Sequence, residues 1–215
     1  QRKEDYRRIL GDFRTGKIDI LVGTQMIAKG LHFPNVTLVG IIFADMALHQ
    51  ADFRAGERTF QLLTQVAGRA GRGDVEGEVF VQAFTPFHPA IQYARRHDYA
   101  GFYEQEIEFR KQLAYPPFTR MALITVKGRN EEKVKFTADH LRREVERATA
   151  DMKGVILKGP APAPLLRAET FYRHQLTLHA VQMSRLSRRL TDIITRFQCP
   201  EDVSWTVDID PVNLL

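Results

Sequence analysis

The sequence predicts an α/β fold, in which a parallel sheet covered by helices is followed by a separate α+β domain. Three observations support this prediction. Helical and strand-like stretches alternate through residues 1–86, which is typical of a parallel sheet with helices packed against it. The run Tyr115-Pro116-Pro117-Phe118 must end any helix, so it marks a boundary. Residues 118–215 then show a second alternation of helix and strand signals.

The first part has the elements of a parallel sheet. Apolar side chains recur at helical spacing over residues 3–13 and 57–67, which predicts two helices. Continuous apolar runs over residues 18–22 and 36–43 are typical of strands buried on both faces. Residues 77–83 are expected to form a third strand.

Residues 87–117 are expected to form a helical connector between the two parts. Pro89 suits the first turn of one helix, because the N–H that proline lacks would have no partner there. Asp98 can cap a second helix with its carboxylate. The connector therefore ends at the two prolines of the boundary.

The last part, residues 118–215, predicts the order β-α-β-β-α-β, which is the ferredoxin-like arrangement. Apolar periodicity predicts one helix over 131–148 and another that Ser184 caps. The proline-rich stretch 159–164 is expected to be an extended loop. Strands are expected at 119–126, 155–158, 175–181 and 203–209.

Composition sets the limits of the possible functions. With 31 Lys and Arg against 26 Asp and Glu, the formal net charge is +5, which permits a polyanionic partner without requiring one. Cys199 is the one cysteine, so the chain can form neither an internal disulfide nor a multi-cysteine zinc site. No apolar run reaches the ~20 residues that span a bilayer. The start without methionine suggests a piece of a longer protein. The single cysteine fits a reducing cytoplasm, which is the expected location.

The strongest motif is Q-x-x-G-R-x-G-R, which begins at Gln65 and ends at Arg72. Its two arginines, Arg69 and Arg72, are three residues apart at a helix end, so they point the same way. Gly68 and Gly71 let the backbone approach a ligand closely. Planar guanidinium groups match phosphate oxygens, as an arginine finger requires. A basic turn on the surface is the alternative interpretation of this motif taken alone.

A second motif, GTQMIAKG over residues 23–30, directly follows an expected buried strand. Ligands of parallel sheets bind at the carboxyl ends of the strands. The polar side chains of Thr24 and Gln25, with the nearby backbone amides, suit contacts to phosphate. Taken alone, the motif could equally be a plain turn from a strand into a helix.

Together, in this order, the two motifs resemble motifs V and VI of superfamily 2 helicases. The longer strings are similar to one family in particular, primosomal protein N′ (PriA). The resemblance covers essentially the whole chain. It rests on the strings GTQMIAKGLHFPNVTLV (23–39), ADFRAGER (51–58), QVAGRAGR (65–72), YPPF (115–118), GPAPAP (159–164), YR (172–173) and VDIDP (207–211).

The resemblance implies roles for particular residues. Residues 1–86 would be the later part of the second RecA-like helicase lobe, and residues 118–215 a C-terminal domain that helps to bind DNA. Arg72 would be the arginine finger that completes the ATP site, with Arg69 and Gln65 at the same interface. Residues implied to bind ATP or to couple it to the DNA strand are Gly23, Thr24, Gln25, Lys29, Gly30, Gly68 and Gly71. Residues implied to contact DNA are Lys158, Tyr172 and Arg173.

For the intact protein, the resemblance implies an ATP-dependent 3′-to-5′ DNA helicase that recognises abandoned forks and D-loops and restarts replication. Its cofactors would be ATP, Mg²⁺ and zinc, and its partners forked and single-stranded DNA, primosome proteins and single-stranded DNA-binding protein. The chain contains no G-x-x-x-x-G-K-[ST] loop, no D-E-x-H and no zinc ligands. The fragment alone is therefore expected to be inactive, and its incomplete sheet is expected to make it dimerise.

Two departures from the family pattern stand out. The family often has two acidic residues just after the strand that follows the GTQMIAKG motif. Phe43 replaces the first of them, so Asp45 alone must fill any role of that pair. The stretch 167–171 lacks the glycine expected before Tyr172.

Two alternative functions remain open for the chain. One is a non-catalytic module that docks DNA or protein, and the other is a different superfamily 2 helicase.

Overall fold

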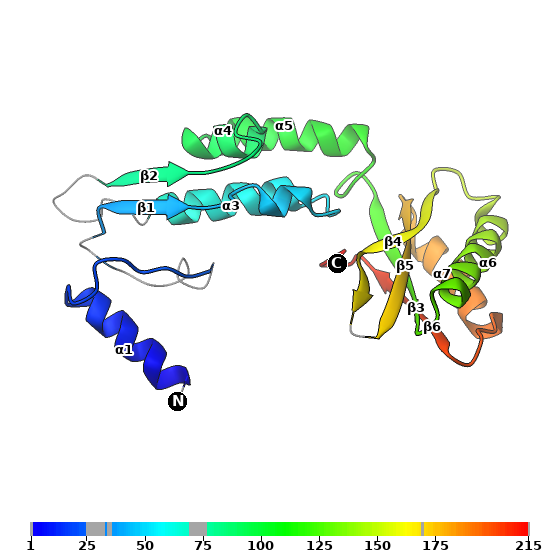
Figure 1. Cartoon of the computed structure of the whole chain (residues 1–215). Coiled ribbons are helices and arrows are strands. Elements are labelled where there is room, and N and C mark those ends of the chain that lie inside the picture. The colour runs from blue at the N-terminus through cyan, green and yellow to red at the C-terminus, as the bar shows by residue number, and fades with distance from the viewer. Residues whose placement is uncertain (1, 25–32, 34–35, 69–76, 169, 215) are drawn as a thin grey trace. The chain divides into compact units, whose positions relative to one another are not determined.

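The computed structural model describes residues 2–24, 33, 36–68, 77–168 and 170–214 (Figure 1). The chain divides into two compact units. Unit 1 comprises Gln1–His49 and Arg54–Glu104, and unit 2 comprises Gln50–Phe53 and Gln105–Leu215. The division falls inside the stretch 87–117 that the sequence assigns to a helical connector. None of the helices in the described ranges combines the length and apolar character of a membrane-spanning helix.

Unit 1 contains the helices and two of the three strands that the sequence predicts for the first part. β1 pairs with β2 in parallel, with Leu38 opposite Glu78 and Ile41 opposite Val81. The last helix, α5, extends into unit 2. The elements are α1 (Arg2–Arg14), β1 (Leu38–Ile41), the 3-10 helix η1 (Met46–His49), α3 (Ala55–Ala67), β2 (Glu78–Val81), α4 (Pro89–Arg95) and α5 (Tyr99–Gln112).

The predicted strand over residues 18–22 is wrong. These residues belong to no ladder in the structure, and Ile20 and Val22 are 78% and 85% exposed. An apolar run becomes a strand only when a neighbour pairs with its backbone, and β1 and β2 pair with each other instead. Upstream, α1 does end as predicted, because Gly16 adopts the left-handed φ of +74° that favours glycine.

The core of unit 1 lies where α3 packs against α4 and the first turn of α5. Its buried members include Phe60 and Leu63 of α3 and Ile91 of α4. The rings of Phe60 and Phe102 are stacked with their centroids 4.4 Å apart. Asp98 caps α5 as expected, since its Oδ1 accepts a hydrogen bond from the Gly101 N–H at 2.8 Å.

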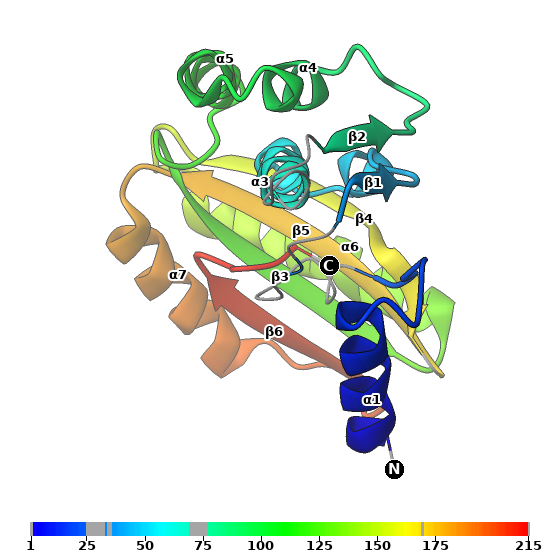
Figure 2. The ribbon, with the colours of Figure 1, turned by 90° about the vertical axis from the view of Figure 1, so that its left-hand side faces the viewer.

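Unit 2 is an antiparallel sheet with two helices on one face (Figure 2). Its strand order is β4-β5-β3-β6, and its element order is β-α-β-β-α-β, as predicted. Both helices contribute to one core, in which Ile124, Leu141 and Leu190 are fully or almost fully buried. The elements are β3 (Arg120–Gly128), α6 (Glu131–Thr149), β4 (Ile156–Ala168), β5 (Phe171–Ala180), α7 (Met183–Arg196) and β6 (Val203–Ile209).

The proline-rich stretch 159–164 is part of a strand, so the predicted loop is wrong. β4 runs without a break from Ile156 to Ala168, although its register against β5 shifts between Lys158 and Ala161 and again after Pro162. β4 is the outermost strand of the sheet. Proline cannot donate to a ladder, but an edge strand with bulges tolerates it because one of its sides has no partner.

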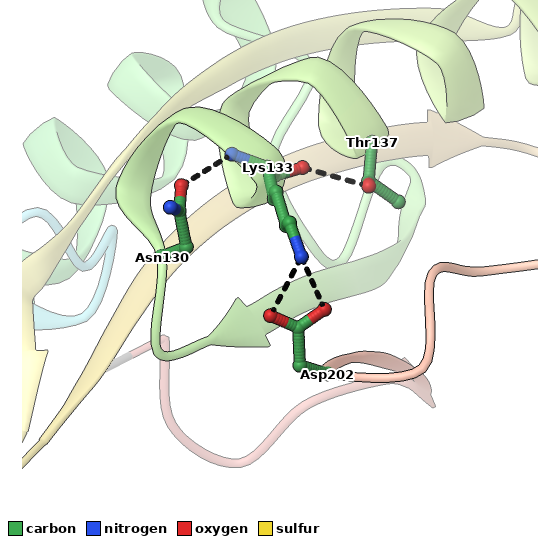
Figure 3. Close-up of polar contacts among 4 residues, drawn as sticks. All are labelled: Asn130, Lys133, Thr137 and Asp202. Carbon is green, nitrogen blue, oxygen red and sulfur yellow. Dashed lines mark hydrogen bonds and ion pairs between the residues drawn. The ribbon is translucent and has the colours of Figure 1, made fainter.

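The two helices of unit 2 begin in different ways. Asn130 caps α6, because its Oδ1 accepts a hydrogen bond from the Lys133 N–H at 3.0 Å (Figure 3). The Lys133 ammonium group lies 3.1 Å from both carboxylate oxygens of Asp202, which fixes this end of α6 beside the start of β6. The predicted cap of α7 by Ser184 is wrong. That helix begins two residues earlier than a Ser184 cap would require, at Met183, and Gln182 takes the N-cap position without a side-chain bond.

Candidate nucleotide and DNA site

The Q-x-x-G-R-x-G-R motif begins on α3. Gln65 is exposed near the end of this helix, and Gly68 follows as its C-cap, with its N–H 3.2 Å from the Thr64 carbonyl oxygen. Arg69, Gly71 and Arg72 lie outside the described residues. The structure therefore places the start of the motif at the carboxyl end of a helix and leaves the roles of its arginines as predictions.

The packing of α3 holds this helix end in place. Phe60 and Leu63 lie on the opposite side from Gln65 and are 5% and 3% exposed. Burying two side chains of this size stabilises the unit by ~1.5–3 kcal/mol each. The polar end of α3 is thus carried by a helix whose apolar side is fixed in the core.

The second motif is described only at its start. Gly23 and Thr24 are exposed and lie in neither a helix nor a strand, whereas Gln25, Lys29 and Gly30 lie outside the described residues. In the described part of the chain, no hydrogen bond joins Thr24 to Gln65. Whether the two motifs meet at a nucleotide thus stays a prediction, because most of the second motif lies outside the described residues.

Asp45 has a role that the sequence pattern did not reveal. Its side chain is 1% exposed, and its Oδ2 accepts hydrogen bonds from the backbone N–H and the hydroxyl of Thr85, both at 2.8 Å. Burial raises the pKa of this carboxyl, but the bonds from Thr85 outweigh it, so the pKa lies below its ordinary value. Asp45 follows β1 and Thr85 follows β2, so the carboxylate ties together the ends of the two parallel strands.

Phe43, which occupies the position where the family often has an acidic residue, is two residues before Asp45. Its backbone has a φ of +53°, and its ring lies 5.5 Å from the ring of Phe84. Phe43 is about half exposed and Phe84 is largely exposed, and both line a cavity of about 100 Å³ together with Gln82 and Ala83. A carboxylate at this position would face solvent, so the buried tie depends on Asp45 alone.

The three residues predicted to contact DNA in unit 2 are not brought together. Tyr172 packs against the core on the helix-covered side of the sheet, whereas Arg173, the next residue, points to the opposite face. Lys158 shares that open face but pairs with Thr177, four residues or about 14 Å along β5 from Arg173. The Lys158 ammonium instead lies 5.3 Å from the centre of the Tyr115 ring.

A buried histidine of β5, His179, connects the sheet to Ala114, the residue just before the Tyr115-Pro116-Pro117-Phe118 boundary. His179 is 1% exposed, and its Nδ1 lies 2.7 Å from the Ala114 carbonyl oxygen. Because a carbonyl oxygen only accepts, Nδ1 is the protonated ring nitrogen. Burial lowers the pKa of His179, although the bond to Ala114 acts in the opposite direction. Sequence patterns did not single out this residue.

Two family models match different parts of the chain. A family model described as the helicase conserved C-terminal domain matches residues 1–74. A second model, the primosomal protein N C-terminal domain, matches residues 111–212 and so covers the whole sheet of unit 2. The chain belongs to the PriA family. The resemblance that the sequence motifs predict is thereby confirmed.

Curated PriA relatives match nearly the entire chain. Replication restart protein PriA of Bacillus subtilis is 41% identical over 218 residues, which cover 100% of this chain and 27% of the relative. The Synechocystis protein of the same name is 41% identical over 214 residues, covering 100% of the chain and 25% of the relative. That of Treponema pallidum is 40% identical over 210 residues, covering 97% and 32%. The chain thus spans about a quarter to a third of the length of these relatives.

Proposed function

We propose that this chain is part of an ATP-dependent 3′-to-5′ DNA helicase that restarts replication at stalled or abandoned forks and at D-loops. The proposal is supported by relatives named replication restart protein PriA and by a helicase domain match that contains both motifs. The observation that carries it is the Q-x-x-G-R-x-G-R motif, which starts at Gln65 on a helix held firmly in a core.

The ATP site would be completed by this chain rather than formed by it. Arg72 would neutralise the charge that develops on the transferring phosphate, and Arg69 and Gln65 would lie at the same interface. The loop that cradles the phosphates and the carboxylate that holds Mg²⁺ would come from another part of the protein, because these 215 residues contain neither motif. Zinc would likewise be bound outside this chain, and Thr24, Gln25 and Lys29 would couple the nucleotide to the DNA strand.

Unit 2 would serve the helicase as a DNA-contacting domain of the ferredoxin-like class. The strand order β4-β5-β3-β6 supports this assignment, since each helix connects two strands that have a third strand between them. Forked and single-stranded DNA, primosome proteins and single-stranded DNA-binding protein would be its partners. Part of the sheet face away from the helices is polar and exposed, as at Ser204 and Thr206 of β6, and is available for such contacts.

Hydrolysis of ATP in the presence of forked DNA tests the proposal. In the full-length protein, Arg72→Ala should lower turnover by ~10³-fold or more while DNA binding is kept. Arg95→Ala is the matched control, because it removes an exposed arginine from α4 in the same unit. Unchanged hydrolysis in the Arg72 variant would exclude an arginine finger and favour a non-catalytic docking module.

A further inference from the structure

An unusual pair of like charges lies side by side at one end of the sheet in unit 2. Lys127 of β3 is directly opposite Arg173 of β5, on the face away from the two helices. The Cβ atoms of directly opposite residues in antiparallel strands are ~4.5–5.5 Å apart, and like charges at that distance destabilise the pair. A nearby carboxylate or an anionic ligand would relieve this repulsion.

The described part of the chain supplies no carboxylate. Neither Lys127 nor Arg173 forms an ion pair with any described residue. The residue on the other side of Lys127 is Ser204 of β6, which is neutral. Asp202, which directly precedes β6, is already paired with Lys133.

A third cation extends the pair. Arg129 follows β3, and its guanidinium group lies 5.6 Å from the centre of the Phe171 ring at the start of β5. A ring beneath the guanidinium group restrains its position, which reduces the entropy lost when it binds an anion. We define the β3–β5 basic patch as Lys127, Arg129, Phe171 and Arg173.

The patch has the chemistry of a phosphate-binding surface. Lys127 and Arg129 are exposed, and Arg173 is half-buried. Three cations on neighbouring strands can contact successive phosphates, since both the strands and the phosphates along a nucleic acid chain are several ångströms apart. We infer that the β3–β5 basic patch binds the phosphate backbone of a DNA strand. This inference rests on the proposed function and assigns part of its DNA contact to these residues.

The salt dependence of DNA binding tests the inference. The affinity of the purified protein for a fluorescent single-stranded oligonucleotide is measured across a series of salt concentrations. The slope of log K against log salt is negative, and each lost phosphate contact lowers its magnitude by about 0.7 for a single strand. The double variant Lys127→Gln/Arg173→Gln should therefore lower the magnitude of the slope by about 1.4 and weaken binding by roughly tenfold at low salt.

Lys135→Gln/Arg143→Gln removes two exposed cations from α6, on the other side of the sheet, and is the matched control. The control should keep the slope and affinity of the unmodified protein. The melting temperature adds a second readout, because removing a repulsive pair should leave it unchanged or raise it. If the double variant loses stability, Lys127→Gln alone, with an expected slope change of about 0.7, decides the question.

The outcomes separate this inference from the proposed function. If the unmodified protein binds DNA and the patch variant has the same slope and affinity, the patch does not contact phosphates and the inference is overturned. If the unmodified protein shows no salt-dependent DNA binding, the proposed function fails as well. If the magnitude of the slope falls in the patch variant but not in the control variant, the result supports both the inference and the proposed function.

Discussion

Gly159 and Gln175 approach each other so closely that the first residue must be glycine. A Cβ atom at position 159 would lie 2.5 Å from the Gln175 carbonyl oxygen, a distance that real Cβ atoms essentially never show. The φ of Gly159 is also +90°, which side chains rarely tolerate. This contact lies where β4 shifts its register against β5, so it links a local backbone requirement to the shape of the sheet edge.

A pair of glycine substitutions separates the two requirements. Gly154 has a φ of +78°, but a Cβ atom added there would meet nothing within 4 Å. Gly154→Ala should therefore cost only the ~1–2 kcal/mol of the left-handed conformation. Gly159→Ala should cost about 1–3 kcal/mol more, because the backbone of β5 must move. Urea unfolding measures both, and equal losses would show that the contact with Gln175 relaxes freely.

The core of unit 2 predicts a strong contrast along one helix. Leu141 of α6 is fully buried, whereas Phe136 of the same helix is 66% exposed. Leu141→Ala should lower the free energy of unfolding by ~2–5 kcal/mol, because it leaves a cavity under the sheet. Phe136→Ala should change it by less than about 0.5 kcal/mol. Chemical denaturation of the two variants checks the contrast, which a loss of similar size in both would contradict.

His179 should make the stability of the protein depend on pH. Its folded pKa lies below the ordinary value, so the unfolded chain binds more protons as the pH falls. The stabilisation is complete above the unfolded pKa of ~6.5 and is lost as the pH falls from there towards the folded pKa. Urea midpoints of the unmodified protein should therefore decrease between pH 7.5 and pH 5.

His179→Asn isolates this contribution, since an asparagine side chain can still donate to the Ala114 carbonyl oxygen. The decrease in midpoint between pH 7.5 and pH 5 should be smaller in this variant. His140→Asn, which changes a half-exposed histidine on α6, should keep the full decrease. The same decrease in all three proteins would assign the pH dependence to other groups.

The parallel sheet of unit 1 should make the isolated 215-residue chain associate. Leu38 and Phe80 lie on one face of β1 and β2 and are 59% and 61% exposed. Parallel sheets are normally covered on both faces, so this face favours contact with a second copy. Light scattering should detect a dimer that the double variant Leu38→Lys/Phe80→Lys abolishes. Val181→Lys, at an exposed position in unit 2, should leave the dimer intact; a monomeric unmodified chain would contradict the prediction.

Local patterns predicted most of the helices and strands. α6, α7 and β6 could be expected because apolar spacing along one segment reflects the side that the segment will bury. The same patterns failed for residues 18–22 and for the prolines of β4. In both cases the outcome depends on whether another strand pairs with the segment, and no local pattern contains that information.

The candidate site divides in the same way. Motifs along the chain were sufficient to predict the PriA family and to single out Gln65, Arg69 and Arg72, because a sequence motif is a contiguous run of residues. The roles of these arginines stay predictions, since Arg69 and Arg72 lie outside the described residues.

Only the tertiary structure decided which distant residues meet. Register places Lys127 opposite Arg173 and turns Tyr172 into the core, and the ends of two strands bring Thr85 to Asp45. These relationships depend on the pairing of segments roughly forty residues or more apart, which is a property of the packed sheet. The amino-acid sequence thus contained the chemistry of the site and the family, while strand pairing selected the partners and the exposed face of each side chain.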